Sequence, residues 1–320
     1  MLEILIWILV LAVSLFVLVK ASNFFTESAE RIGLFFGMPA FIVGVTIVAI
    51  GTSLPELISS ILAVLRGSSE IVVGNVIGSN IANIFLILGI IAIIGKKLKI
   101  TYEILHVDLP ILVGSAFLLA IVIWDGAVTL PEAILLLLGT AVYFSYTLSL
   151  KSEQKDVRIV DGIKIEKRKK KELGGKTVFI LLISAFFIYA GAKYTVESVI
   201  NLSELLNLGT EIIAVSAVAF GTSLPELAVG IAAIRKGKAE IAVGNLIGSN
   251  IFNSFIVMGV PALFGALIIP SSILTFGLPM MLIATFLFFF ITQEKIITKW
   301  EGYMLLLFYI FFIGKLFNLF

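Results

Sequence analysis

Cysteine is absent from the 320-residue sequence, and histidine occurs once, at His106. Without cysteine the chain has no disulfide scaffold, no thiol redox chemistry and no cysteine-ligated metal site. A zinc site built from histidines or a Ser-His-Asp hydrolase would have to rely on His106 alone. Charge is also scarce, since 14% of residues are charged and the formal net charge is +2. This net charge is too small to indicate a nucleic-acid partner.

Apolar residues, in contrast, make up 60% of the chain, and its mean hydropathy is +1.14. Soluble domains are about 45–50% apolar, so the composition predicts an integral membrane protein. A helix of about 20 apolar residues crosses the hydrocarbon core, and ten stretches are long enough. We expect an all-α membrane protein with spans at roughly 2–20, 38–65, 70–95, 107–124, 128–150, 176–195, 209–234, 240–266, 272–292 and 300–318. The first stretch has no basic residue before it, which argues against a cleaved signal peptide.

The positions of lysine and arginine predict the orientation of these spans, because cytoplasmic loops are enriched in both. Segment 151–176 holds ten basic residues, including the run 167–171, and we expect it in the cytoplasm. Alternating outward from this loop puts both termini outside, with 20 basic residues inside and 3 outside. This sorting supports ten spans in the cell membrane. The basic run could instead be a lipid-binding patch.

An internal repeat divides the chain. Residues 51–83 match residues 221–253 without gaps, at an offset of 170 and with 21 identities in 33 positions. We therefore expect a first five-helix repeat at 1–150, a basic cytoplasmic loop at 151–175 and a second five-helix repeat at 176–320. Because five is odd, the second repeat must enter the membrane inverted. Inverted repeats are typical of secondary transporters, whose ion site lies at the midplane between the halves.

The strongest matching falls on polar residues inside the spans, above all Glu56 and Glu226. A charge at the bilayer centre costs at least about 2.5–3.5 kcal/mol, so it faces a cavity or a partner. Neither glutamate has a basic residue nearby in its span, and the obvious partner is a bound cation. Two such carboxylates balance one divalent or two monovalent cations. Alternatively, one or both are protonated.

The motif around each glutamate, G-T-S-L-P-E, explains how further ligands become available. Pro55 has no N–H and obstructs the carbonyl of Gly51, so we expect freed carbonyls around 49–51 and, by the same reasoning, around 219–221. Unwound backbone is tolerated at membrane depth where it lines a cavity. Ser53 and Glu56 also have the spacing of a capping box, which would start a half-helix after the break. The same box recurs at Ser223 and Glu226.

The second motif, G-N-x-I-G-S-N-I-x-N, occupies 74–83 and 244–253. Its glycines are four residues apart, which predicts close helix packing. Ser79 and Asn83 share a helix face, and packing of spans 2 and 3 would bring them towards Glu56; Ser249 and Asn253 would do the same for Glu226. Each motif has two further asparagines, which are Asn75 and Asn80 in the first motif. These two side chains could bond to broken backbone or contact the ion, and the two roles are equally plausible.

All of these candidate ligands are oxygen atoms. Hard cations take oxygen ligands, and calcium takes about six to eight of them. Zinc, copper and iron are poor candidates without imidazole or thiolate ligands. Na⁺ and Ca²⁺ are similar in size, so one cluster could serve both.

Both motifs resemble the two alpha repeats of the calcium/cation antiporter superfamily, and most closely those of prokaryotic sodium/calcium exchangers. The resemblance covers the whole chain and implies ten helices in two inverted halves, with helices 2, 3, 7 and 8 forming a central ion-binding core. It also implies alternating access to the ion site in this core. It implies exchange of Na⁺ for Ca²⁺, no cofactor, and no partner beyond these ions and membrane lipid. The ligands that it implies are Thr52, Ser53, Glu56, Ser79, Asn83, Thr222, Ser223, Glu226, Ser249 and Asn253, with backbone oxygens at Ala49 and Ala219.

One position departs from the family. Many members carry aspartate where Asn253 stands, and here both equivalent positions are asparagine. One ionisable group is lost, although two carboxylates still neutralise one Ca²⁺. The counter-ion therefore stays open between Na⁺, H⁺ and K⁺, and a Ca²⁺/H⁺ antiporter is the nearest alternative. A channel and an intramembrane enzyme are more distant alternatives, and the enzyme would need His106, which is far in sequence from Ser53 and Ser79.

Overall fold

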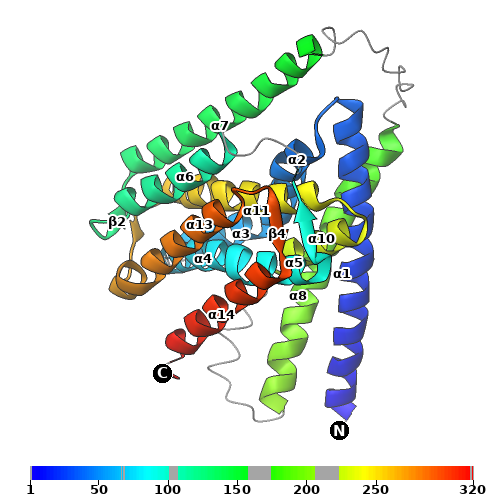
Figure 1. Ribbon diagram of the computed structural model, residues 1–320. Coiled ribbons are helices and arrows are strands. Elements are labelled where there is room, and N and C mark those ends of the chain that lie inside the picture. Colours follow the sequence, from blue (N-terminus) through cyan, green and yellow to red (C-terminus); the bar gives the residue numbers. More distant parts are fainter. Residues whose placement is uncertain are drawn as a thin grey trace.

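The computed structural model describes residues 2–65, 67, 69–100, 107–157, 174–205, 223–317 and 319, and almost all of them are helical (Figure 1). Within these ranges seven helices are long and apolar enough to cross a membrane: Glu3–Phe35, Ala40–Leu65, Ser69–Gly95, Leu130–Thr147, Gly175–Tyr194, Ala239–Ala262 and Ile273–Ile291. Asp108–Val122 is a shorter apolar helix. The chain is therefore a helical, multi-pass membrane protein.

The first half of the chain alternates α-helices with π-helical turns. Its elements are α1 (Leu2–Phe35), α2 (Ala40–Val43), η1 (Gly44–Val48), α3 (Ala49–Leu65), α4 (Ser69–Ile81), η2 (Ala82–Leu88), α5 (Gly89–Gly95), β1 (Lys97–Lys99), α6 (Asp108–Val122), β2 (Ala127–Val128) and α7 (Leu130–Val157). The π-helices η1 and η2 lie within otherwise continuous helices. Such bulges are frequent at functional sites.

The second half has similar elements in the same order. They are α8 (Gly175–Leu205), α10 (Leu224–Arg235), α11 (Ala239–Phe252), η3 (Asn253–Val257), α12 (Met258–Ala262), β3 (Leu267–Ile268), η4 (Ile273–Gly277), α13 (Leu278–Ile291), β4 (Ile296–Thr298) and α14 (Lys299–Leu316). The bulge η3 begins at Asn253, and η2 begins at Ala82, next to Asn83. Both therefore lie at the end of the repeated second motif.

Helix α1 is longer than the sequence predicts, since it continues from the expected end near residue 20 to Phe35. The extension buries Phe25, Ala29 and Ile32 together with the hydroxyl side chains of Ser22, Thr26 and Ser28. Phe25 lies so close to Gly51 that a Cβ atom there would collide with its ring. Helices α1 and α8 lie side by side as a long pair beside the remaining helices (Figure 1).

Two short antiparallel ribbons join the halves. Strand β1 pairs with β4, and β2 pairs with β3. The offset of 170 that relates the sequence repeats also carries β1 onto β3 and β2 onto β4. The two ribbons are thus equivalent, because the offset turns the pair β1–β4 into the pair β3–β2.

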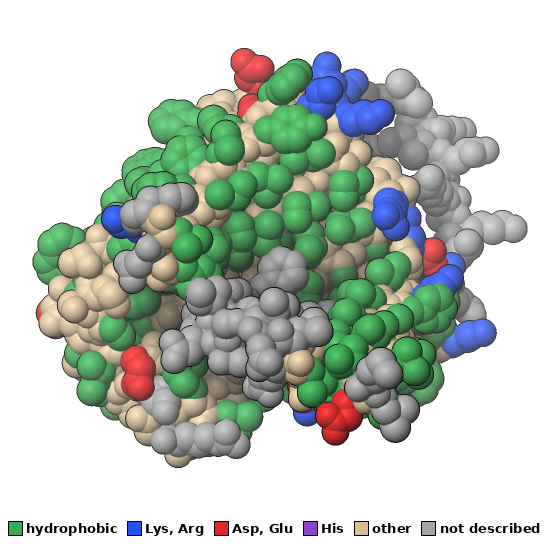
Figure 2. Space-filling model, turned by 90° about the horizontal axis from the view of Figure 1, so that it is seen from below, with side chains coloured by type: hydrophobic (Ala, Val, Ile, Leu, Met, Phe, Trp, Pro, Cys, Tyr) green, Lys and Arg blue, Asp and Glu red, His purple; other side chains and the backbone are tan. Residues whose placement is uncertain are grey.

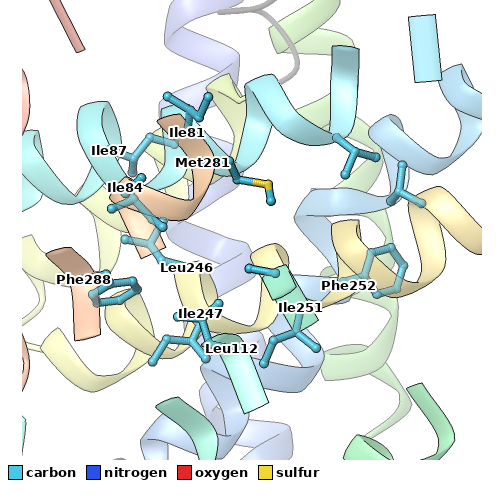
Figure 3. Close-up of a cluster of buried hydrophobic side chains, with 14 of the residues drawn as sticks. Ile81, Ile84, Ile87, Leu112, Leu246, Ile247, Ile251, Phe252, Met281 and Phe288 are labelled. Carbon is cyan, nitrogen blue, oxygen red and sulfur yellow. The ribbon is translucent and has the colours of Figure 1, made fainter. Parts of the chain in front are cut away.

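The centre of the molecule is built around α11, which is buried along almost its whole length. Its side chains pack with those of α4, η2, α6 and α13 in an apolar cluster (Figure 3). On another side α11 approaches the backbone of α2 and η1, where a Cβ on Gly244 or Gly248 would collide with the carbonyl oxygen of Phe41 or Val45. The prediction of close packing is confirmed at these two glycines, and the helix they approach comes from the other half of the chain. At Gly74 and Gly78 no described atom lies within 4 Å of an added Cβ, so the prediction is not borne out there.

The outer surface is apolar, as expected for contact with lipid. Large hydrophobic side chains are exposed along α1, α7, α8 and α14. Figure 2 shows one face on which hydrophobic side chains dominate and lysine and arginine lie towards the margin. This surface would aggregate in water, and it fits a hydrocarbon environment.

Candidate functional site

Glu56 on α3 and Glu226 on α10 are buried in the interior, each with 1% of its surface exposed. Their carboxyl groups are close enough to interact electrostatically. Ser53 Oγ donates to Glu226 Oε1 at 3.2 Å, and this bond joins the two halves. The prediction that both glutamates face the interior rather than lipid is therefore confirmed. Their sharing of one ion stays a prediction.

Hydroxyl groups next to Glu56 also contact residues of the second half of the chain. Ser53 Oγ lies 3.0 Å from Ser249 Oγ on α11. Thr52 Oγ1 lies 3.2 Å from Asn245 Oδ1, 3.2 Å from the Val48 carbonyl oxygen and 3.3 Å from the Ala49 carbonyl oxygen. Thr52, Ser53 and Ser249 are buried. Ser249 of the second half thus contacts the first half at Ser53.

Ser79 reaches the neighbourhood of Glu56 through Asn75. The Asn75 amide nitrogen lies 3.1 Å from Ser60 Oγ and 3.4 Å from the Glu56 carbonyl oxygen. Ser79 Oγ lies 3.5 Å from Asn75 Oδ1. Asn75 therefore contacts a carbonyl oxygen and a hydroxyl of α3, which is an unbroken helix here, so the predicted bond to broken backbone is not found. Its contact with the ion stays a prediction.

Four asparagines form reciprocal hydrogen bonds between α4, η2, α11 and η3. Asn83 Nδ2 donates to Asn250 Oδ1 at 3.0 Å, and Asn253 Nδ2 donates to Asn80 Oδ1 at 3.2 Å. All four side chains are buried. Sequence reasoning did not foresee these bonds between the halves, although all four residues lie in the repeated motif.

Eight buried side-chain nitrogen or oxygen atoms lack a hydrogen-bond partner in the described part of the chain. Five are oxygens of predicted ligands: Glu56 Oε2, Asn83 Oδ1, Ser223 Oγ, Glu226 Oε2 and Asn253 Oδ1. The other three are Thr140 Oγ1, Asn245 Nδ2 and Asn250 Nδ2. Buried polar atoms are rarely left unpaired, because each one costs about 1–3 kcal/mol. Five such atoms on predicted ligands, all of them oxygens, fit a hard cation. Among the described residues no group of three or more acidic, histidine or cysteine side chains is placed so that it could hold a metal ion.

The expected helix break at Pro55 is wrong. Helix α3 runs unbroken from Ala49 to Leu65 with Pro55 inside it. The irregular backbone lies about two to three turns before Pro55, in η1, and the Thr52 hydroxyl lies within hydrogen-bonding distance of the Ala49 carbonyl oxygen. Ser53 therefore starts no half-helix.

At the second box the predicted helix start is confirmed, because Ser223 is the N-cap residue of α10. The capping box itself is wrong, since the Ser223 side chain makes no capping hydrogen bond. The Ser223 hydroxyl is instead one of the unpaired oxygens. Thr222 and Ala219 lie outside the described residues, as does His106.

A further buried acid was not singled out as a site. Asp108 begins α6, is fully buried, and accepts bonds from the hydroxyls of Tyr143 at 3.3 Å and Tyr146 at 3.4 Å. The signal was present in the sequence, because the two tyrosines are three residues apart and share a face of one helix. The positions equivalent to these three residues in the second half are Leu278, Ile313 and Leu316, so the cluster exists in one half only.

Known proteins resemble the chain over nearly its whole length. A family model described as "Sodium/calcium exchanger protein" matches residues 6–149 and 176–317. The sodium/calcium exchanger MaX1 of Methanosarcina acetivorans is 36% identical over 343 residues, which cover 97% of this chain and 98% of MaX1. A structure of the sodium-calcium exchanger NCX_Mj soaked with Na⁺ and Sr²⁺ has a TM-score of 0.82 and 27% identity, covering 97% of this chain and 99% of that one. A structure of NCX_Mj soaked with Na⁺ and Ca²⁺ has a TM-score of 0.81 and 28% identity, covering 97% and 98%.

Proposed function

The chain belongs to the sodium/calcium exchanger family, and from this premise we propose that it is a secondary active antiporter that exchanges Na⁺ for Ca²⁺ across the cell membrane. The observation that carries the proposal is the set of unpaired buried oxygens around Glu56 and Glu226. A hard cation satisfies such oxygens, and the family's exchangers supply the identity of the ions. No cofactor and no chemical reaction are needed for this activity.

The proposed architecture is ten spans in two inverted five-helix repeats, 1–150 and 176–320, joined by the basic loop 151–175. Three relationships support it. The sequence repeat has a constant offset, the two ribbons are equivalent under that offset, and so are the two asparagine bonds. An axis that exchanges the halves produces all three. With the basic loop in the cytoplasm, both termini lie outside.

In the proposed ion site the two glutamates supply the charge and neutral oxygens complete the coordination. The proposed ligands are Ala49, Thr52, Ser53, Glu56, Ser79, Asn83, Ala219, Thr222, Ser223, Glu226, Ser249 and Asn253. Two carboxylates neutralise one Ca²⁺ or two Na⁺, so the two loads compete for the same atoms. An occupied site has its charge compensated and can change its access. The empty site has two uncompensated carboxylates and cannot change its access. This difference couples the flux of Na⁺ to the flux of Ca²⁺.

The moving part in this proposal is the pair α1 and α8. These helices pack on each other along their length (Figure 1) and contact the rest of the molecule mainly through α10. We expect them to slide against the other helices as the site alternates between the two sides of the membrane.

The test is uptake of ⁴⁵Ca²⁺ into proteoliposomes driven by an outward Na⁺ gradient. Glu56→Gln and Glu226→Gln should each abolish uptake, because each removes half of the charge that holds Ca²⁺. Glu70→Gln is the matched control, since Glu70 is an exposed glutamate on α4, and it should transport normally. Near-normal uptake by both site variants would refute the proposed site.

The same vesicles identify the counter-ion. Gradients of Na⁺, H⁺ and K⁺ are imposed one at a time, and Ca²⁺ uptake is followed in each. Uptake that needs only the Na⁺ gradient supports the proposal. Uptake driven by H⁺ without Na⁺ would make the protein a Ca²⁺/H⁺ antiporter, and uptake without any counter-ion would make it a channel.

A further inference from the structure

We propose that Asn80 and Asn250 are positioning residues that turn the amide oxygens of Asn83 and Asn253 towards the transported cation. The proposal rests on the proposed exchange function, because it concerns how that ion site is built. Asn80 and Asn250 are 170 residues apart, as are Asn83 and Asn253. The two halves therefore contribute one positioning asparagine and one ligand asparagine each.

Each ligand amide is held by its nitrogen. Asn83 Nδ2 donates to Asn250 Oδ1 at 3.0 Å, and Asn253 Nδ2 donates to Asn80 Oδ1 at 3.2 Å. An amide carries its nitrogen and its oxygen on opposite sides of one planar carbon. A hydrogen bond that fixes Nδ2 towards the positioning residue consequently turns Oδ1 away from it.

The oxygens that are turned away are those left unpaired. Asn83 Oδ1 and Asn253 Oδ1 are buried and have no hydrogen-bond partner in the part of the chain that the structure describes. Glu56 Oε2 and Glu226 Oε2 are also buried without a hydrogen-bond partner in the described residues. Both ligand asparagines thus leave an oxygen unpaired and hold their own amide nitrogen in a hydrogen bond. The opposite orientation would point two N–H donors at a cation, which repels them.

Asn80 is itself fixed in place. Its amide nitrogen lies 3.1 Å from Ser254 Oγ and 3.4 Å from the carbonyl oxygen of Asn250. It also lies 3.7 Å from the sulfur of Met281, whose side chain lies beside Ile81 and Ile84 (Figure 3). With its nitrogen engaged, Asn80 can present only its oxygen to Asn253. The direction of the ligand amide follows from this arrangement.

Asn250 offers the cleaner experiment of the two. Its side chain makes a single hydrogen bond among those seen in the described residues, as the acceptor from Asn83, and its own Nδ2 has no partner there. Asn250→Leu removes the acceptor at similar volume. Asn250→Asp keeps an oxygen in the same place and replaces the unpaired nitrogen with a second oxygen, which adds a negative charge when the group is ionised.

The measurement is equilibrium binding of ⁴⁵Ca²⁺ to purified protein in detergent, with thermal unfolding as the check that each variant is folded. Loss of a residue that orients a metal ligand weakens metal binding about 10–100-fold, and we expect Asn250→Leu to raise the Kd for Ca²⁺ by about 10-fold. Asn250→Asp should bind at least as tightly as the wild type. Because the added charge of Asn250→Asp can itself tighten Ca²⁺ binding, the double-mutant cycle below separates positioning of Asn83 from a merely structural role.

A double-mutant cycle tests whether Asn250 acts through Asn83. Asn83→Ala removes the ligand oxygen, so adding Asn250→Leu should change the Kd by less than about twofold, as coupled residues do. If Asn250→Leu does not fold, the reciprocal cycle of Asn80→Leu with Asn253→Ala tests the same relationship in the other half.

Three results would overturn the proposal: Asn250→Leu binding as tightly as the wild type, Asn250→Asp binding as weakly as Asn250→Leu, or the two substitutions of a cycle multiplying their effects. Binding does not require transport. A wild-type protein that binds Ca²⁺ but fails to exchange it for Na⁺ would therefore refute the proposed function and leave this test intact.

Discussion

Ser53 of α3 donates its hydroxyl hydrogen to Oε1 of Glu226, which lies 173 residues later in the chain. This bond, at 3.2 Å, occupies one oxygen of the Glu226 carboxylate and leaves the other without a partner in the described residues. The same hydroxyl lies 3.0 Å from Ser249. Ser53 is therefore the residue through which the first half of the chain orients the acid of the second.

Ser53→Ala should weaken Ca²⁺ binding about tenfold or more, because a hydrogen bond to a charged group contributes about 1.5–3 kcal/mol. Equilibrium ⁴⁵Ca²⁺ binding measures the loss. Ser59→Ala is a suitable control, since Ser59 is an exposed serine on the same helix. Equal affinity of both variants would show that Ser53 does not hold Glu226 in its binding orientation.

Gly248→Val should destabilise the protein and prevent Na⁺-driven Ca²⁺ uptake. A Cβ at Gly248 would collide with the Val45 carbonyl oxygen and approach the Ala49 Cβ to 2.7 Å, so α11 would have to move away from η1 and α3. Thermal unfolding and vesicle uptake measure the two effects.

Gly114→Ala on α6 is the comparison, because no described atom lies within 4 Å of the added Cβ. Alanine also favours a helix by about 1 kcal/mol over glycine. We expect Gly114→Ala to be at least as stable as the wild type. A Gly248→Val variant with wild-type stability would contradict the close approach of the two backbones.

The turn between α10 and α11 is attached to α1 by ion pairs. Lys236 Nζ lies 3.0 Å from Glu27 Oε1, and Lys238 Nζ lies 2.5 Å from Glu30 Oε1. Lys236→Glu should lower thermal stability slightly, because partly exposed pairs contribute about 0.2–1 kcal/mol. The exchanged pair Glu27→Lys with Lys236→Glu should restore it.

Salt provides the control for this prediction, since screening weakens exposed ion pairs. The difference between wild type and Lys236→Glu should shrink as the salt concentration rises. A double variant no more stable than the single one would mean that the pair contributes nothing.

Asp108 depends on its two tyrosine partners. Tyr143→Phe or Tyr146→Phe removes a hydroxyl that donates to a fully buried carboxyl group, and each loss should cost about 1–3 kcal/mol. Thermal unfolding should register the decrease. Tyr303→Phe, which changes an exposed tyrosine on α14, should have little effect, and equal stability of all three variants would contradict the assignment.

The sequence was most informative at positions where only one physical reason accounts for the residue type found there. Glu56 and Glu226 could be assigned to the interior because ionised groups are too costly to place in lipid. Gly244 and Gly248 predicted a close approach because glycine alone permits one. Their spacing did not reveal the helix that they approach, since that depends on how the halves are arranged.

The remaining features depend on tertiary contacts that sequence spacing does not contain. Pro55 suggested a break, yet α3 continues through it and the irregular turn lies in η1. The bonds of Asn80 and Asn250 to the other half join residues about 170 positions apart, which no local pattern can predict. The length of α1 is likewise set by packing, because its final turns bury Phe25 and Ile32.

The ribbons β1–β4 and β2–β3 limit how the molecule can open. Each one ties a segment before residue 150 to a segment after residue 260 by main-chain hydrogen bonds. A clamshell motion, in which one whole half rocks away from the other, would have to break both. Among the described strands none belongs to α1 or α8 or adjoins them in the chain, so the sliding proposed for these two helices would leave both ribbons intact.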